Sequence, residues 1–141
     1  MTSQTNVSYN TEPGLTAEEF ARVLTESGLG AQRPVSDKAR LSAMLAASSL
    51  ILTARLNHPA GELVGVARCI SDFAWCAYVS ELAVSPSAQG VGIGKGLLAH
   101  AREELGPQVS LILISVPEAV GFYENEGMER LPDAFWYRRE Y

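Results

Sequence analysis

Glycines occupy every second position from Gly90 to Gly96, in a stretch that also contains Lys95. Ordering a glycine costs more conformational entropy than ordering any other residue, so such a cluster indicates that something must approach the main chain closely. Unpaired N–H groups at the start of a helix bind phosphate well, because they lie at the positive end of the helix dipole. The stretch therefore predicts a site for a phosphate-bearing cofactor. The alternative is a flexible turn between a strand and a helix.

The spacing of these glycines differs from both common nucleotide-binding motifs. A P-loop requires its first glycine where Gln89 stands, and a serine or threonine where Gly96 stands. The dinucleotide motif G-x-G-x-x-G requires its third glycine where the chain has Lys95 or Leu97. What remains is a Q-G-x-G-x-G segment between an apolar run and a helical pattern.

The size and composition of the chain limit the classes of protein to consider. We expect a single domain over residues 1–141, because this length buries a core without disulfides or a metal. The net charge of −5 argues against a nucleic-acid partner. No apolar run is long enough for a membrane span and the first residues lack a signal layout, so we expect a cytoplasmic protein. Cys69 and Cys76 match no metal-ligand spacing, so no metal site is expected.

The elements that flank the glycines predict a mixed α/β fold with a single sheet. The proline and glycine between the second and third apolar runs predict a hairpin, and the fourth run extends the antiparallel meander. The run at 109–116 is nearly all apolar, which is typical of a central strand buried on both faces. Strands are expected at 7–9, 49–57, 62–70, 76–85, 109–116 and 134–141, and helices at 16–30, 36–49, 95–107 and 117–127.

Capping signals and apolar spacing locate the helices. Thr16, followed by Glu19 three residues later, predicts the start of the first helix, and Gly28 or Gly30 its end. Ser36 is the expected start of the second helix. Its inner face is expected to carry Ala39, Met44 and Ala47, and that of the third helix Leu97, Ala101 and Leu105.

Two separated motifs give the chain a family resemblance. The stretch from Glu81 to Glu103 resembles the acetyl-CoA motif of the GNAT superfamily of N-acetyltransferases, whose signature Q/R-x-x-G-x-G/A matches Gln89, Gly92 and Gly94. Further on, GFYENEGM resembles the F-Y-E-x-x-G-F segment of the same family. The resemblance covers the chain from about residue 49 to its end. Val116 stands about where many members carry an asparagine.

The resemblance implies a central, mostly antiparallel sheet that is splayed at the cofactor site and flanked by about four helices. It implies acetyl-CoA as the cofactor, with main-chain contacts from Leu82, Ala83 and Val84 to its pantetheine arm. The amides that would wrap its pyrophosphate belong to Gln89, Gly90, Val91, Gly92, Ile93, Gly94 and Lys95.

Tyr123 matches the tyrosine that GNAT members commonly place beside the cofactor sulfur, which implies a general acid. A phenol is a weaker acid than a thiol, so full proton transfer to the thiolate would be uphill by about 2 kcal/mol in water. A hydrogen bond to the developing thiolate is the safer description. The alternative is a tyrosine that packs its ring on the sheet.

Glu81 stands within an apolar strand, where an unpaired carboxylate would be expensive to bury. One interpretation is a general base that takes the ammonium proton of the acceptor through one or two waters. The other is a structural ion pair with Arg68 or Arg55, or exposure at the splayed end of the strand. The sequence leaves these alternatives open.

Aromatic residues with a nearby acid surround the turn before the strand at 76–85. An aromatic wall of this kind would suit an amine that bears an apolar or aromatic body. The alternative is a turn with a hydrophobic cluster of its own. The residues expected to border this pocket are Asp72, Phe73, Trp75 and Tyr78.

The sequence thus predicts an enzyme that moves an acetyl group from acetyl-CoA to a primary amine of a small molecule by direct attack. One alternative is a non-catalytic module that binds or senses acyl-CoA. Another is an acetyltransferase for protein N-termini or lysines. A homodimer formed through the strand at 134–141 is also expected, since that strand would lie at an exposed edge.

Overall fold

A computed structural model describes residues 6–141, so the expectations for residues 1–5 lie outside the described part. Five strands form one sheet in the order β1-β2-β3-β4-β5. Neighbouring strands are antiparallel except for β5, which runs parallel to β4. The hairpin and the meander expected from the sequence are confirmed. The strands are β1 (Val7–Thr11), β2 (Leu50–Leu56), β3 (Leu63–Ser71), β4 (Cys76–Val84) and β5 (Ser110–Leu113).

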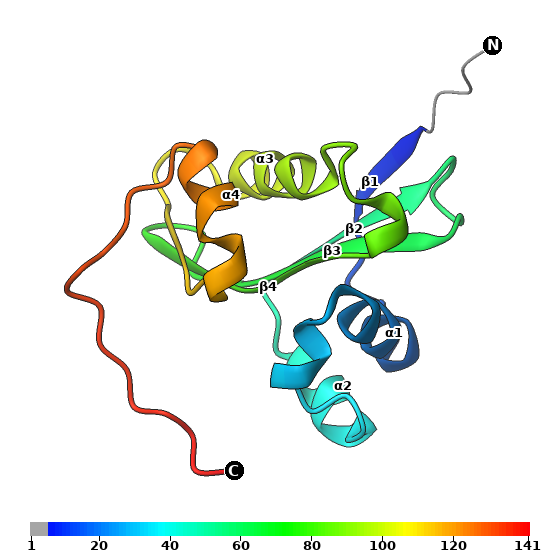
Figure 1. Cartoon of the computed structure of the whole chain (residues 1–141), viewed down its shortest axis with the longest axis horizontal. Coiled ribbons are helices and arrows are strands. Elements are labelled where there is room, and N and C mark those ends of the chain that lie inside the picture. The colour runs from blue at the N-terminus through cyan, green and yellow to red at the C-terminus, as the bar shows by residue number, and fades with distance from the viewer. Residues whose placement is uncertain (1–5) are drawn as a thin grey trace.

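Helices cover the sheet on both faces (Figure 1). On one face lie α1 (Ala17–Ser27) and α2 (Lys38–Ala46), and on the other lies α3 (Ile93–Leu105). Each face has its own hydrophobic core, one around Phe20 and Leu24 and one around Leu97 and Ala101. Burial of large apolar side chains on both faces is the main stabilising term of such a layered fold. The remaining elements are η1 (Leu29–Gln32), η2 (Pro86–Ala88), η3 (Pro117–Ala119) and α4 (Val120–Asn125).

The start of α1 confirms the expected cap. The Thr16 hydroxyl accepts a hydrogen bond from the N–H of Glu19 at 3.2 Å, and Gly28 ends the helix in the left-handed region with φ 88°. The Glu19 carboxylate does not complete a capping box by accepting from the N–H of Thr16. It pairs instead with Arg55 at 2.9 Å, because that guanidinium is buried and needs two acids around it.

The prediction for α2 was wrong by one residue and in its inner face. Asp37, not Ser36, caps the helix through a 3.0 Å bond from the N–H of Arg40. Leu41 and Leu45 are the buried residues, whereas Ala39 and Ala47 are exposed and Met44 is half-buried. Leucines four apart bury more apolar area than the alanines, which sets the rotation of the helix about its axis.

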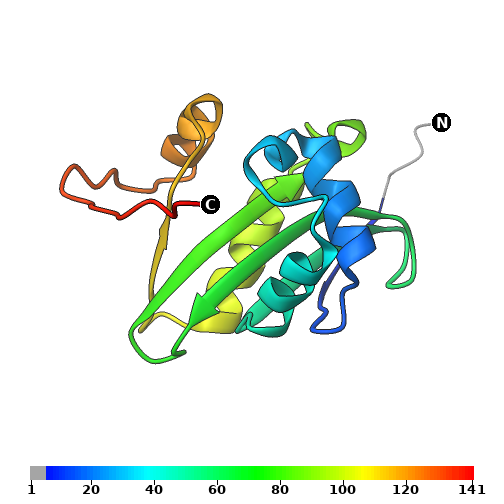
Figure 2. The same cartoon turned by 90° about the horizontal axis from the view of Figure 1, so that it is seen from below.

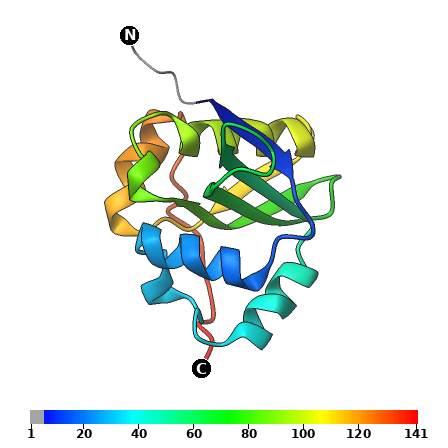
Figure 3. The same cartoon turned by 90° about the vertical axis from the view of Figure 1, so that its right-hand side faces the viewer.

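The C-terminal part of the chain differs most from the expectation. The run at 109–116 was expected to be a central strand, but β5 is the last strand of the sheet and alternates between exposed and half-buried residues. Residues 134–141 form no strand; in Figure 2 they cross in front of β5, on the side of the sheet that carries α1 and α2 (Figure 3). The main-chain oxygen of Tyr141 accepts an exposed hydrogen bond from Arg40 of α2 at 3.1 Å, and no backbone bond joins residues 134–141 to β5.

The sheet opens between its last two strands. Pairing of β4 with β5 runs from Cys76↔Ser110 to Val79↔Leu113 and then stops, while β4 continues to Val84 against β3 alone. Arg68 lies opposite Glu81 and Cys69 opposite Val79, so Ser80 is an extra residue, a β-bulge, at the point of separation. This opening, which we call the fork, confirms the splayed sheet.

Candidate active site

The edge of β4 beyond the fork offers free backbone groups. The N–H of Ser85 donates to the carbonyl of Val64 in β3 at 2.8 Å, so by alternation Ala83 also faces β3, whereas Leu82 and Val84 face the fork. The Gln89 side chain donates to the Val84 carbonyl at 3.1 Å. Of the three residues expected to contact a pantetheine arm, Leu82 and Val84 therefore have the correct backbone direction.

The glycine loop leads from this edge into α3. Gly90 and Gly92 have φ 89° and 81°, a left-handed conformation that L side chains rarely adopt. Gly92 caps α3, and within residues 6–141 no side chain takes the helix's first N–H groups. The N–H groups of the first turn, Ile93 to Lys95, are therefore free for an anion.

The other two alternate glycines have a packing role. A Cβ on Gly94 would lie 3.2 Å from the ring of Phe122 in α4, and a Cβ on Gly96 would collide with the Tyr9 hydroxyl. Tyr9 in turn stacks on His100 of α3, with ring centroids 4.6 Å apart. The sequence predicts a ligand at all four alternate glycines. The structure shows that two of them serve close contacts of α3 with α4 and β1.

Glu81 is fully buried among arginines. Its Oε2 accepts from Arg33 Nε at 2.7 Å and from the Ser80 hydroxyl at 2.8 Å, and Arg68 donates to both carboxylate oxygens. Burial pushes the pKa of this carboxyl upward, but the hydrogen bonds from Arg68, Arg33 and Ser80 outweigh it and hold the pKa below its usual value. These contacts support the ion-pair alternative with Arg68. Arg55 is no partner of Glu81, since it pairs with Glu12 and Glu19.

Tyr123 lies on α4, which stands beside the first turn of α3 through the contact of Phe122 with Gly94. The Tyr123 ring meets the Phe122 ring edge-on at 5.1 Å. Burial raises the pKa of the Tyr123 phenol above its ordinary value, so the hydroxyl keeps its proton at neutral pH. The structure thus brings the helix of Tyr123 to the glycine loop.

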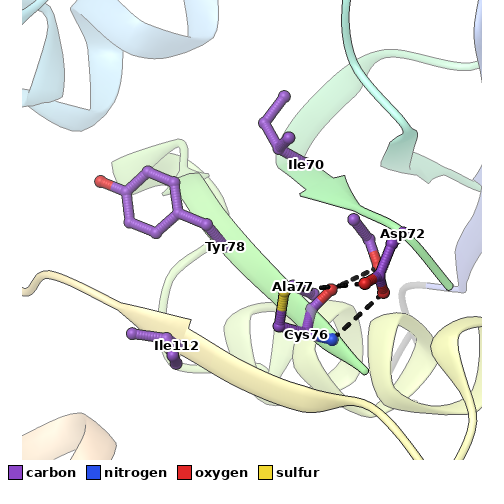
Figure 4. A pocket seen from close by; sticks show the side chains of 7 residues that line it. Ile70, Asp72, Cys76, Ala77, Tyr78 and Ile112 are labelled. Atoms are coloured by element: carbon purple, nitrogen blue, oxygen red, sulfur yellow. Dashed lines mark hydrogen bonds between the residues drawn. The ribbon is translucent and has the colours of Figure 1, made fainter. Parts of the chain in front are cut away.

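Three of the four residues expected around an acceptor pocket belong to the β3–β4 turn. Asp72 Oδ1 accepts from the N–H groups of Ala74, Trp75 and Cys76, at 2.9, 2.8 and 3.2 Å. These bonds hold the pKa of the Asp72 carboxyl below its usual value. Phe73 and Trp75 project from the same turn and are exposed. This arrangement supports the alternative of a self-contained turn for Phe73 and Trp75, whereas Asp72 lines the same pocket as Tyr78 (Figure 4).

Tyr78 belongs to a row of apolar side chains that the sequence did not reveal. Ile70 lies opposite Tyr78, and Tyr78 lies opposite Ile112, so the three share one face of the sheet. Figure 4 shows this apolar row, Ile70–Tyr78–Ile112, lining a hollow of about 330 Å³. The row immediately precedes the last paired row before the fork, Val79↔Leu113. Only the strand register could have identified Ile70 and Ile112, because they lie 42 residues apart in the sequence.

The described residues contain neither a metal site nor a membrane-spanning helix. No group of three or more His, Cys, Asp or Glu side chains within 6–141 is arranged to hold a metal ion. No helix in that range has both the length and the apolar composition of a membrane span.

Cys69 is buried, which raises the pKa of its thiol to about 11, so it is a core residue rather than a nucleophile.

Comparison with known proteins gives the class of protein that this fold and site define. The family model of the acetyltransferase (GNAT) domain matches residues 21–135. The chain therefore belongs to the GNAT acetyltransferase family.

Individual relatives agree with the family. The uncharacterized N-acetyltransferase ycf52 of Porphyra purpurea is 32% identical over 99 residues, which cover 65% of this chain and 57% of the relative. Serotonin N-acetyltransferase 2, chloroplastic, of Oryza sativa subsp. japonica is 38% identical over 80 residues, 55% of this chain and 40% of the relative. The chain thus spans about half the length of the curated relatives it matches.

A solved structure shows the same fold at low sequence identity. An aminoglycoside N-acetyltransferase in complex with CoA superimposes with a TM-score of 0.73 and 15% identity, over 99% of both chains. At this identity the likeness concerns the fold alone.

Proposed function

We propose that this protein binds acetyl-CoA and transfers the acetyl group to a primary amine of a small molecule by direct attack of the amine. One observation carries the proposal: the fork between β4 and β5 opens immediately before the loop whose glycines lead into the uncapped start of α3. A ligand that needs both an extended polar partner and an anion site would find the two on consecutive segments of the chain.

The residues present fit acetyl-CoA. The main-chain N–H and C=O of Leu82 and the N–H of Val84 suit the amide-bearing pantetheine arm, which would add to β4 as a strand does, whereas the Val84 carbonyl already accepts from Gln89. The N–H groups of Ile93, Gly94 and Lys95 suit the pyrophosphate, and the exposed Lys95 side chain adds a positive charge. When bound, acetyl-CoA supplies an acetyl group activated as a thioester.

Two groups of the chain have defined tasks in this proposal. The N–H of Leu82, which faces the fork, stabilises the negative charge that develops on the acetyl oxygen during attack. The Tyr123 hydroxyl, protonated at neutral pH, donates a hydrogen bond to the sulfur as the thiolate leaves. Both groups stabilise charge that is absent from the starting state, so they would raise kcat rather than lower KM.

The apolar row Ile70–Tyr78–Ile112 supports an acceptor amine with an apolar or aromatic body. The row lies next to the fork. Its side chains are on the same face of the sheet as α1 and α2, and α3 is on the other face (Figure 1). A cofactor bound at the start of α3 leaves this face open to the acceptor. Its side chains are about 40% exposed, at 42%, 38% and 43%, so an apolar body placed there would bury them further.

This substrate class gives a measurable prediction. In an assay of thiol release from acetyl-CoA, we expect phenylalkylamines to be better substrates than polyamines. Ile112→Ser should raise the KM for a phenylalkylamine about 10-fold, since about 1.4 kcal/mol of apolar contact is lost, and should leave the KM for acetyl-CoA unchanged. Leu131→Ser, at an exposed apolar residue of the C-terminal segment, is the matched control.

The assay also separates the alternatives. Preference for polyamines, or an Ile112→Ser enzyme with the wild-type KM, would contradict the apolar acceptor. Acetylation of a peptide but of no small amine would favour a protein acetyltransferase. Binding of acetyl-CoA with no turnover on any amine would favour the non-catalytic module.

The proposal includes a homodimer formed through residues 134–141. Phe135 and Tyr137 are 94% and 105% exposed, and the outer edge of β5 has no strand partner within residues 6–141. Light scattering should therefore give twice the chain mass of 15.2 kDa, and replacement of both aromatic residues with serine should give the monomer. A monomeric wild-type protein at working concentration would contradict the dimer.

The expected cytoplasmic location also stays a prediction. The rice relative is chloroplastic by name, so a fluorescent fusion of the protein is the appropriate test.

A further inference from the structure

Two arginines hold the β-bulge at the fork. Arg68 of β3 donates to the Glu81 carboxylate and, through Nη2, to the Ser80 hydroxyl at 3.0 Å. Arg33, which follows η1, donates to Glu81 from Nε at 2.7 Å and to the Ser80 carbonyl from Nη2 at 2.7 Å. Ser80 is therefore held through its hydroxyl and its carbonyl, and Glu81 through its carboxylate. We call Arg33, Arg68, Ser80 and Glu81 the bulge clamp.

The position of the bulge clamp matters because β4 loses one of its neighbours there. Val79 is the last residue of β4 that pairs with β5, and Leu82 is the first residue beyond the bulge whose backbone faces the fork. A bulge turns the following residues, so its geometry sets the direction of the Leu82 N–H. Beyond the fork, the ladder with β3 is the other main-chain constraint on that direction.

The contribution of Arg33 differs from that of Arg68. Arg68 and Glu81 are buried residues of adjacent strands, whereas the Arg33 side chain is 21% exposed and comes from the segment between α1 and α2. Of the two arginines, only Arg33 reaches the Ser80 carbonyl, and its planar guanidinium bonds to this carbonyl and to Glu81 at once. Removal of Arg33 thus frees the main chain of the bulge, while the Arg68–Glu81 pair stays in place.

We propose that Arg33 is a positioning residue for acetyl transfer: through Ser80 and Glu81 it fixes the Leu82 N–H in the direction that stabilises the reacting acetyl group. Glu81 is the anchor of the bulge clamp, and the proton that the acceptor nitrogen loses passes to solvent water rather than to Glu81. This inference rests on the proposed function, since it assigns the Leu82 N–H its task. The bulge clamp itself can be tested without measuring catalysis.

The first test compares kinetic constants. Arg33→Met should lower kcat at least about 10-fold and change the KM for acetyl-CoA less than about twofold. The reason is that the hydrogen bond from the Leu82 N–H strengthens only as charge develops on the acetyl oxygen. Arg33→Lys should not restore kcat, since one ammonium group cannot reach Glu81 and the Ser80 carbonyl in the same geometry. Arg55→Met is the control: it breaks a buried ion pair on β2, two strands from β4, and should leave kcat unchanged in the folded protein.

The second test separates the anchor from a general base. Glu81→Gln should lower kcat by a similar factor at every pH, so the acidic limb of the pH profile keeps its position. Loss of that limb in Glu81→Gln would show that Glu81 is the base. Wild-type kcat in Arg33→Met, or restoration by Arg33→Lys, would overturn the positioning role.

The third test is independent of catalysis. In backbone NMR spectra of the protein without acetyl-CoA, Arg33→Met should shift the amide signals of Ser80 and Leu82, whereas Arg55→Met should not. Unshifted signals in Arg33→Met would contradict the bulge clamp. If the wild-type protein acetylates no amine while these amides do shift, the proposed function fails and the structural part of the inference stands.

Discussion

Replacement of Gly92 with aspartate should weaken the binding of acetyl-CoA by at least about 100-fold, or about 2.8 kcal/mol. Gly92 caps α3 with φ 81°, and the free N–H groups of the first helical turn follow it directly. An aspartate there would place a carboxylate beside the bound pyrophosphate. Like charges about 4 Å apart repel by about 4 kcal/mol near a protein surface, which exceeds the predicted loss.

A matched variant separates this repulsion from backbone strain. Gly92→Asn has nearly the same shape without the charge, and asparagine tolerates the left-handed region better than most residues. Titration calorimetry should give it an affinity between those of the wild type and Gly92→Asp. Wild-type affinity in Gly92→Asp would show that the loop does not hold the phosphates. Equal losses in both variants would assign the effect to the backbone.

Tyr123→Phe should lower kcat by about 100-fold, within the usual range for loss of a general acid, and leave the KM for acetyl-CoA unchanged. Since burial raises the pKa of this phenol, the donating form persists through neutral pH and is lost only as pH rises through that elevated pKa. The wild-type profile should therefore carry an alkaline limb that Tyr123→Phe lacks.

Tyr9→Phe is the control for this prediction. Tyr9 is also a half-buried phenol with a pKa raised by burial, but it lies on β1 and stacks on His100. Its loss should leave kcat and the alkaline limb as in the wild type. Unchanged turnover in Tyr123→Phe on a true substrate would remove Tyr123 from the mechanism.

Local signals in the sequence were sufficient for several elements of the fold. The cap of α1 depends on Thr16 and the N–H of Glu19 three residues away, and the turn from β2 to β3 depends on Pro59 and Gly61, two residues apart. The glycine loop could be located because Gly90 and Gly92 need a conformation that other residues avoid. In each case the interacting groups lie within a few residues.

Long-range contacts explain what the sequence could not reveal. Arg33 is 48 residues from Glu81, and nothing near either residue identifies the other as its partner. The apolar row needs the register of three strands, of which β5 follows a whole helix. The apolar run at 109–116 predicts a buried strand, yet burial on both faces and two paired edges depend on what lies beyond β5. Within residues 6–141, no strand lies beyond β5.

The most direct test of the central claim is a thermal-shift measurement of the purified protein with acetyl-CoA, CoA, ATP and NADPH in turn. A ligand that binds the folded state at 100 times its Kd adds about 2.7 kcal/mol of stability. For a chain of this size, that is a rise in Tm of about 5 to 10 °C. We predict such a rise with acetyl-CoA and CoA and none with the other two. A rise in Tm with ATP or NADPH, and none with acetyl-CoA or CoA, would mean that the glycine loop binds a different phosphate ligand. That result would contradict the proposed acetyl transfer from acetyl-CoA.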